Sequence, residues 1–498
     1  MQMGRGSVTL HPPFLHLLTA KLKITSGAYM NKNNTLAKST FIIAIGTFLP
    51  KLASFITLPI LTGCLTKEQY GTYDIITVLV SLYLPSLTLQ IKSAAFRFLL
   101  DVREDREKQK GIITNIMFLT VPIAVISLLI LYIFLPGITS AVKLWICGYY
   151  LADILVNTVR QVARGLGKNL DYSISAIISA FGKMVFAVIF VWGLKLGLIG
   201  GTIALCLASL LSLLYIACRL KIWKYMDFKL VDKEITKSML GYSWPIVPNE
   251  MSLWVMNMSD RLIVTQVLGI AVNAIYSAST KIPQLINLAQ SALNLAWQEC
   301  AALSVKDKDS SDYYTEMFNT MLKLQGGAFG VVIGSAPVLF PILIRGSYEE
   351  AYTQIPILCA GLFFSGMAIY LGGIYLAFKA SKSVGLTTMG AAVINIIVDI
   401  SLINFIGIYA ASISTLVSYI CLFIFRSINI RKLTTIRYNF KTFAIVLFFM
   451  VVEVVLFYQG TLVFNIINAV LGYSVCILLN MDIIKAMFHA IAKKLKKS

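Results

Sequence analysis

The chain has 498 residues, of which 58% are hydrophobic and only 13% are charged. Soluble domains carry about 25% charged residues, so this composition excludes an ordinary soluble protein and indicates a polytopic membrane protein. The eight Cys form no CxxC pair, and the three His lie near the chain ends. We therefore expect no metal site.

Apolar segments follow one another along most of the chain, beginning at Ser39. Their length of roughly 17–25 residues is what a helix needs to cross a ~30 Å hydrocarbon core. We predict spans at 39–62, 73–96, 114–135, 141–159, 172–194, 197–218, 242–264, 272–300, 317–343, 353–377, 384–405, 408–425, 442–458 and 462–480. The fold class is therefore all-α and polytopic, with about fourteen transmembrane helices.

The spans and the polar segments divide the chain into six parts. They are an N-terminal cytoplasmic segment expected to be disordered (1–38), a six-helix bundle (39–218), a cytoplasmic linker (219–241), a second six-helix bundle (242–428), two extra transmembrane helices (441–480) and a basic cytoplasmic tail (481–498).

The formal net charge of +20 follows the predicted topology. Lys and Arg accumulate in the cytoplasmic loops of membrane proteins. With the N-terminus placed inside, 33 of the 43 Lys and Arg fall in inside segments, and only Lys67, Lys195 and Arg345 fall in outside loops. Arg426 is counted as the first basic residue of the inside loop 426–441. The distribution predicts that both termini are cytoplasmic, and it explains most of the charge without a nucleic-acid partner.

A weak internal repeat links the first and the seventh predicted spans. The eighteen residues from Ile60 align without gaps to those from Ile263, at an offset of 203 residues and with five identities, Tyr73 and Tyr276 among them. An even number of spans separates the two copies, so both have the same orientation. This predicts two six-helix bundles related by a pseudo-two-fold axis along the membrane normal.

Four basic residues lie inside predicted spans with apolar residues on both sides: Lys51, Lys92, Arg261 and Lys281. An ionisable residue at membrane depth costs several kcal/mol, so such residues face a bundle interior or a watery cavity and mark a pathway. Arg forms bidentate contacts to oxyanions, and Lys acts as a point charge. We predict that the four residues line a cationic cavity that binds an anion such as a phosphate or pyrophosphate.

Embedded acids offer two further roles. Asp74, Glu250, Asp260 and Glu299 could neutralise the buried cations, or they could bind H⁺ or Na⁺ and couple transport to an ion gradient. The sequence leaves both roles open, and we expect no other cofactor.

No catalytic residues are predicted. The chain has no GxxxxGK[ST], HExxH or GxSxG motif, and its predicted outside loops are too short for a catalytic domain. We therefore expect a transporter and not an enzyme.

Two stretches resemble one family of membrane proteins. The run LPKLASFITLPILTGCLTKEQYGTYDII from Leu49, followed by AAFRFLLDVRED, resembles the opening of polysaccharide-biosynthesis (Wzx-type) flippases of the MOP superfamily. The run YSWPIVPNEMSLWVMNMSDRLIVTQVLG from Tyr242, followed by AIYSASTKIPQL, resembles their mid-chain signature. The resemblance covers roughly the stretch from Ser39 to Asn480.

The resemblance implies a bacterial cytoplasmic (inner) membrane protein whose two bundles form a V-shaped cavity that alternates between the two sides. The implied substrate is an undecaprenyl-pyrophosphate-linked oligosaccharide, moved to the outer leaflet for O antigen, capsule or exopolysaccharide synthesis. The family's cationic cavity positions match Arg261 in the Ser259-Asp260-Arg261 motif, Lys281 and Lys51, whereas Lys92 rests on the charge argument. A polysaccharide polymerase and a chain-length regulator are implied partners, together with membrane lipid.

Two other functions stay open. A MATE-like cation-coupled exporter of small molecules would need an acidic cavity, whereas the embedded charges on the first, second, seventh and eighth spans include four basic residues. A membrane polysaccharide polymerase usually needs a sizeable external loop with catalytic residues, and no predicted outside loop is long enough.

Overall fold

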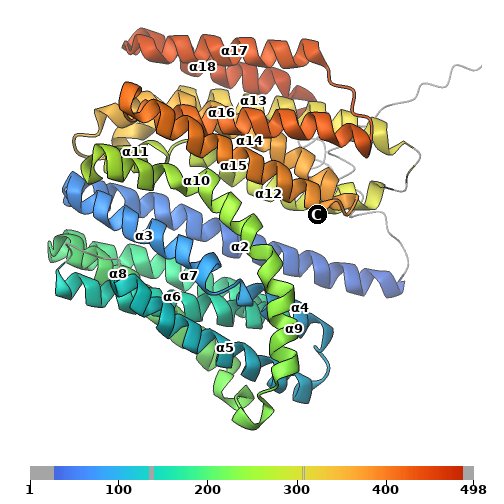
Figure 1. Ribbon diagram of the computed structural model, residues 1–498. Helices are drawn as coiled ribbons and strands as arrows, with labels where there is room; N and C mark the ends of the chain where they lie inside the picture. The colour runs from blue at the N-terminus through green and yellow to red at the C-terminus, as the bar shows by residue number, and fades with distance from the viewer. Residues whose placement is uncertain (1–26, 134–138, 306, 308, 486–498) are drawn as a thin grey trace, which may run out of the picture.

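The computed structural model describes residues 27–133, 139–305, 307 and 309–485, and this part of the chain is helical without a strand. The first half, which we call the N-half, packs into one bundle (Figure 1). Its helices are α2 (Gly27–Cys64), α3 (Lys67–Leu87), α4 (Ile91–Asp101), α5 (Arg106–Ile133), α6 (Ser140–Gly165), α7 (Asn169–Ala187) with the π-helical turn η2 (Val188–Gly193), and α8 (Gly197–Leu220).

A linker of short helices leads from this bundle into a second one. The linker contains η3 (Ile222–Tyr225), η4 (Phe228–Leu230) and α9 (Lys233–Ser243). The second bundle, the C-half, contains η5 (Trp244–Ile246), α10 (Val247–Leu268), α11 (Ile270–Ser279), α12 (Gln284–Ser304), α13 (Ser310–Leu343), α14 (Glu349–Ala377), α15 (Ser381–Ile406), α16 (Tyr409–Asn429) and η6 (Ile430–Lys432). The last pair, α17 (Phe440–Gln459) and α18 (Leu462–Leu479), packs against α13 at the edge of the C-half (Figure 1).

The predicted fold class is confirmed: two bundles in parallel repeat are followed by two extra helices. Eleven described helices are long and apolar enough to cross a membrane. The other three predicted spans correspond to α3 with α4, to α10, and to α11 with α12, and these helices carry several polar residues of the site described below.

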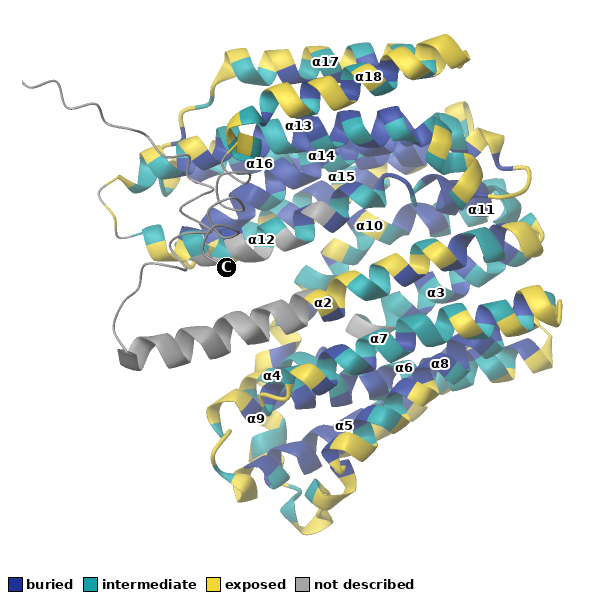
Figure 2. Ribbon diagram, turned by 180° about the vertical axis from the view of Figure 1, so that it is seen from behind, coloured by how far each residue is buried: buried dark blue, intermediate teal, exposed yellow. Residues whose placement is uncertain are grey.

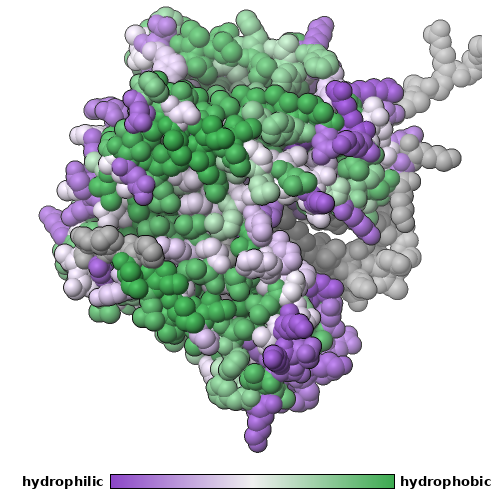
Figure 3. All heavy atoms as spheres, viewed as in Figure 1, coloured by the Kyte–Doolittle hydropathy of each residue, from purple (hydrophilic) through white to green (hydrophobic). Residues whose placement is uncertain are grey.

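The apolar surface of the molecule explains how these helices sit in lipid. Ile133, Phe405 and Leu462 are between 74% and 84% exposed, and apolar side chains cover much of the surface in Figure 3. Other apolar side chains are buried inside the molecule. In the apolar stretch of α14, 72% of the residues are buried, and Figure 2 shows buried residues concentrated around α13 and α14. The hydrophobic faces therefore point both outward and inward, as expected in a bilayer.

In the described part of the chain the two halves pack most closely at one end. We call the end that carries the start of α2 and the last described residues the terminal end, and its counterpart the opposite end (Figure 1). At the opposite end α3 packs against α10 and α11 of the C-half. There the Arg345 backbone N–H donates to Thr62 Oγ1 at 3.0 Å, and the rings of Tyr70 and Tyr348 meet edge to face with centroids 6.2 Å apart. Toward the terminal end Figure 3 shows a hollow between the halves.

Three details differ from the sequence prediction. The segment 1–38 was expected to be disordered, but α2 already begins at Gly27; residues 1–26 lie outside the described part. The predicted span 73–96 is broken at Leu89 and Gln90, which both have positive φ. The predicted span 272–300 is broken between α11 and α12, where Pro283 precedes the first turn of α12. A proline removes a backbone donor, and left-handed residues end a helix, so both breaks follow from local chemistry.

The C-terminal pair is held by close contact between glycines. A Cβ added at Gly472 of α18 would collide with the backbone carbonyl of Gly330 on α13, and Gly330 in turn lies against the buried Glu453 of α17. Small residues let transmembrane helices approach closely and gain van der Waals contact.

Replacing Gly472 with Val should therefore push α18 away from α13 and destabilise the protein by about 1–3 kcal/mol. Thermal unfolding of the purified protein in detergent measures this loss. Gly111→Ala is the matched control, because a Cβ there meets nothing within 4 Å. Equal unfolding temperatures for Gly472→Val and the wild type would contradict the close packing of the pair.

Candidate functional site

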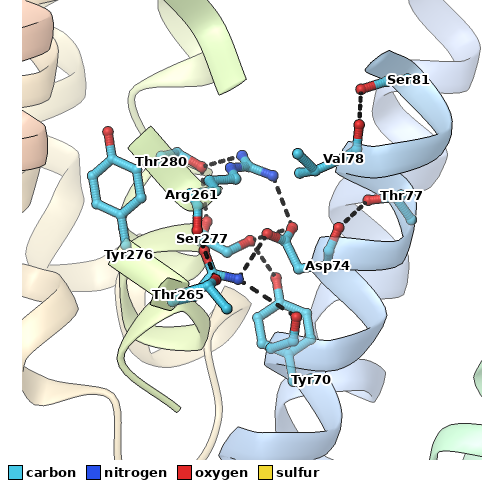
Figure 4. Close-up of polar contacts among 12 residues, drawn as sticks. Tyr70, Asp74, Thr77, Val78, Ser81, Arg261, Thr265, Tyr276, Ser277 and Thr280 are labelled. Atoms are coloured by element: carbon cyan, nitrogen blue, oxygen red, sulfur yellow. Dashed lines mark hydrogen bonds and ion pairs between the residues drawn. The ribbon is translucent and has the colours of Figure 1, made fainter. Parts of the chain in front are cut away.

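An ion pair between Arg261 and Asp74 joins the two halves (Figure 4). Arg261 on α10 donates from Nη1 to Asp74 Oδ1 on α3 at 2.8 Å, and each side chain is only 5% exposed. Arg261 also donates from Nη2 to Thr280 Oγ1 at 3.2 Å. The pair crosses the place where α3 packs against α10 and α11, so it ties the halves together near the opposite end.

Asp74 has two more partners on α11. Ser277 Oγ donates to Asp74 Oδ1 at 2.7 Å, and Asn273 Nδ2 donates to Asp74 Oδ2 at 3.3 Å. Ser277 lies 203 residues after Asp74, which is the offset of the repeat. Positions that are equivalent in the two halves therefore meet each other, as they must on a two-fold axis.

Lys281 lies beside this pair, at the break between α11 and α12. Its side chain is half-buried, and its ammonium group is close enough to Arg261 and Asp74 to interact electrostatically with both. The structure therefore brings together Arg261 and Lys281, two of the four predicted cationic residues, whereas Arg261 already has a carboxylate partner. An anion-binding role for these residues stays a prediction.

Lys51 lies on α2 and reaches across to the C-half. Its Nζ donates to Ser291 Oγ on α12 at 2.8 Å. Lys51 lines a cavity of about 340 Å³. Amide and hydroxyl side chains dominate its polar lining; the lining residues are Lys51, Leu253, Met256, Asn257, Asn287, Gln290, Ser291, Asn294, Ser365, Ile369, Thr388, Tyr419, Leu422 and Arg426.

A smaller cavity of about 70 Å³ shares four of these residues and extends toward the ion pair. Asp260, Arg261 and Thr280 line its far side. The two cavities together form a polar path along the inner face of the C-half, from Lys51 to Arg261.

Lys92 lies apart from the other three cations. It occupies the first turn of α4 in the N-half, half-buried, and the acidic groups that act on it are Glu250 and Asp153. Glu250 stands in the first turn of α10. Among the described residues no ion pair joins Lys92 to Glu250, so charge pairing and substrate binding by Lys92 both stay predictions. The side chain of Glu299 lies outside the described part of the structure.

Asp260 belongs to a second polar cluster inside the C-half. Its Oδ2 accepts from the Tyr276 hydroxyl at 2.9 Å and from Thr415 Oγ1 at 2.7 Å. Asp399 on α15 acts electrostatically on the same cluster, is fully buried, and has no hydrogen-bond partner on either carboxylate oxygen. Asn395, one turn earlier on α15, accepts from Ser259 Oγ at 3.2 Å. The cluster places hydroxyl and amide oxygens beside two buried carboxyl groups inside the C-half.

Arg426 is a buried arginine, although the sequence predicts it in an inside loop. It lies on the last turn of α16 with only 5% of its surface exposed, and it lines the larger cavity. Its position at the end of an apolar span made it look like a loop residue, because Lys and Arg at span ends ordinarily extend to the interface.

In the described residues, no group of three or more His, Cys, Asp or Glu is placed to hold a metal ion.

Comparisons with known proteins agree with this architecture. A family model described as "Polysaccharide biosynthesis protein" matches residues 36–298. Among curated proteins, no sequence matches the chain significantly.

Several solved structures share the fold. The "Lipid II flippase MurJ, inward closed conformation" is similar with a TM-score of 0.69 and 14% identity, over 90% of this chain and 100% of that chain. An inward-facing multidrug resistance MATE family transporter of the MOP superfamily is similar with a TM-score of 0.64 and 13% identity, over 79% and 98%. A MOP superfamily transporter from Pyrococcus furiosus, described as having a binding pocket of reversed polarity, is similar with a TM-score of 0.58 and 12% identity, over 80% of this chain and 96% of that chain. At these identities the likeness shows the fold alone.

Proposed function

Because this chain belongs to the polysaccharide biosynthesis protein family, we propose that it moves undecaprenyl-pyrophosphate-linked oligosaccharides from the cytoplasmic to the outer leaflet of a bacterial cytoplasmic membrane. The terminal end is the cytoplasmic end in this proposal, since the basic segments gather there and Lys and Arg favour the cytoplasmic side. The movement is by alternating access between the N-half and the C-half.

One observation carries the proposal: among the described residues, partly buried cations lie on the facing sides of two halves that pack most closely at one end. Lys51 and Lys281 stand on these surfaces, on α2 and between α11 and α12. A charged, hydroxylated head group cannot cross hydrocarbon unaided, because its desolvation is too costly. A polar cavity with fixed positive charge lowers that cost while the polyprenyl chain stays in lipid.

Coupling to H⁺ or Na⁺ is the part of the proposal that the second polar cluster supports. Asp260 and Asp399 are buried carboxyl groups, and three of their four carboxylate oxygens lack a hydrogen-bond partner. Oxygen ligands suit hard cations, and a carboxyl at membrane depth also suits a proton. Asn395 and Thr415 would complete the set of ligands for a bound ion.

A MATE-like exporter is the second candidate, and the same acids favour it. The larger cavity argues against it, because none of its described lining residues is acidic while Lys51 and Arg426 are basic. An exporter of cationic compounds needs the opposite charge there.

The deciding experiment uses a strain that lacks the gene and follows both surface glycan and its lipid-linked precursor. The wild-type chain should restore surface glycan, and Lys51→Ala with Lys281→Ala should reduce it about tenfold or more, because each charged contact is worth about 1.5–3 kcal/mol. Lys382→Ala, an exposed residue on α15, is the matched control. Normal surface glycan in the deletion strain, with altered drug sensitivity, would instead establish the exporter.

A further inference from the structure

The larger cavity has the size of a small-molecule site. Its volume of about 340 Å³ lies within the range of ligand pockets, which begins near 300 Å³. Residues of α10, α12, α14, α15 and α16 form its walls, and Lys51 of α2 closes one side. It lies on the inner face of the C-half, beside the proposed path of the head group.

Arg426 brings an uncompensated positive charge to this cavity. It donates to the Ala368 carbonyl at 2.6 Å, to Thr387 Oγ1 at 3.3 Å and to Thr388 Oγ1 at 3.1 Å. All three acceptors are neutral, and none of the described residues that line the cavity is acidic. A guanidinium has five N–H donors, so two remain for another partner. A buried charge without a counter-charge is costly, and an anionic ligand would remove that cost.

Gln290 is a second side chain that lacks a partner in this cavity. It is only 7% exposed, and neither its amide nitrogen nor its amide oxygen has a hydrogen-bond partner. A Cβ added at Gly366 on α14 would overlap the Gln290 amide and would also meet the amide of Gln325 on α13. The glycine therefore leaves room for both amides. The donors and acceptor of the Gln290 amide are otherwise unused, and such groups are rare in native structures and need an explanation.

We propose that this cavity is a specificity subsite for a carboxylated sugar within the transported oligosaccharide. Arg426 binds the sugar carboxylate, and Gln290 binds ring hydroxyls together with Asn257, Asn287 and Asn294. Amides both donate to and accept from hydroxyl groups, whereas a pyrophosphate, with oxyanions and no hydroxyl groups, would leave the amide oxygens without donors. The inference rests on the proposed transport of lipid-linked glycans, and it adds the charge class of the sugar.

The test measures binding of three probes to the purified full-length protein in detergent by isothermal titration calorimetry: D-glucuronate, D-glucose and inorganic pyrophosphate. Glucuronate should bind about tenfold or more tightly than glucose, and Arg426→Gln should remove that difference, because a charged hydrogen bond is worth about 1.5–3 kcal/mol. Arg431→Gln, an exposed arginine just after α16, is the matched control and should bind like the wild type.

Gln290→Leu is a second variant, and we expect it to fold like the wild type. It removes a buried amide that has no partner, so its thermal stability should equal or exceed that of the wild type. Its binding of glucuronate should nevertheless weaken several-fold, which a purely structural residue would not show. Unchanged binding in this variant would overturn the role of Gln290.

Two other results would overturn the subsite. Equal binding of glucose and glucuronate by the wild type would exclude recognition of the carboxylate. Binding of pyrophosphate that depends on Arg426, without binding of glucuronate, would assign the cavity to the lipid carrier's phosphates. Either result leaves the transport proposal intact, because the deletion-strain assay tests it separately.

Discussion

Replacing Arg261 with Ala should destabilise the protein by about 3–5 kcal/mol and abolish surface glycan, since removing one partner of a buried ion pair leaves the other charge uncompensated. Asp74 is 5% exposed and would keep only Ser277 and Asn273 as partners. Asp74→Ala should have a similar effect. The double variant should lose less than the sum of the two single losses, because it leaves no charge behind. Thermal unfolding and the surface-glycan assay measure both effects.

A second Arg–Asp pair supplies the control. Arg219 donates from Nε to Asp171 Oδ1 at 3.1 Å, but the Arg219 side chain is 62% exposed. An exposed pair contributes about 0–1 kcal/mol, so Arg219→Ala should change stability little. The comparison separates the effect of burial from the effect of removing an arginine.

The same variants separate two roles of Arg261. If Arg261 serves only to bind a substrate anion, Arg261→Ala abolishes glycan at normal stability, and Asp74→Ala leaves glycan intact. If the ion pair seals the opposite end, both variants lose glycan and both unfold earlier. A stable, fully active Asp74→Ala protein would contradict the sealing role.

The long apolar segments made the helices predictable, because a bilayer leaves few alternatives to a span of about 20 apolar residues. The repeat was predictable from little more than the offset between Ile60 and Ile263, and the contact of Asp74 with Ser277 at that offset confirms it geometrically. Helix breaks were harder to foresee. The left-handed backbone of Leu89 and Gln90 leaves no mark in an apolar sequence, since neither residue is typical of that conformation.

Partners at the site could not be predicted, because pairing depends on which helices meet in space. Asp74 and Arg261 lie 187 residues apart, and several embedded acids were equally good partners in the sequence. Arg426 shows the limit most clearly. Spacing and hydropathy placed it in a loop, whereas the packing of α14, α15 and α16 encloses it.

Replacing Asp399 with Asn should uncouple transport from the ion gradient. Asp399 is fully buried, both of its carboxylate oxygens lack a hydrogen-bond partner, and Asp260 is the acid that acts on it. Two neighbouring carboxyl groups resist ionising together, so a bound proton or Na⁺ would relieve their repulsion. The amide that replaces the Asp399 carboxylate in the variant carries no negative charge, so the cluster should bind the ion more weakly.

Proteoliposomes with an imposed Na⁺ gradient or pH gradient test this directly, with translocation of an undecaprenyl-pyrophosphate-linked disaccharide as the readout. One of the two gradients should accelerate transport by the wild type. Asp399→Asn should lose at least about nine-tenths of that acceleration, because the loss of a charged contact worth more than about 1.4 kcal/mol weakens binding of the ion about tenfold. Glu453→Gln is the matched control: Glu453 is equally buried, with an unpartnered oxygen, but it lies on α17 between α13 and α18. An Asp399→Asn protein that keeps its full response to the gradient would contradict a role of Asp399 in coupling and would leave Asp260, with Asn395 and Thr415, as the remaining candidate.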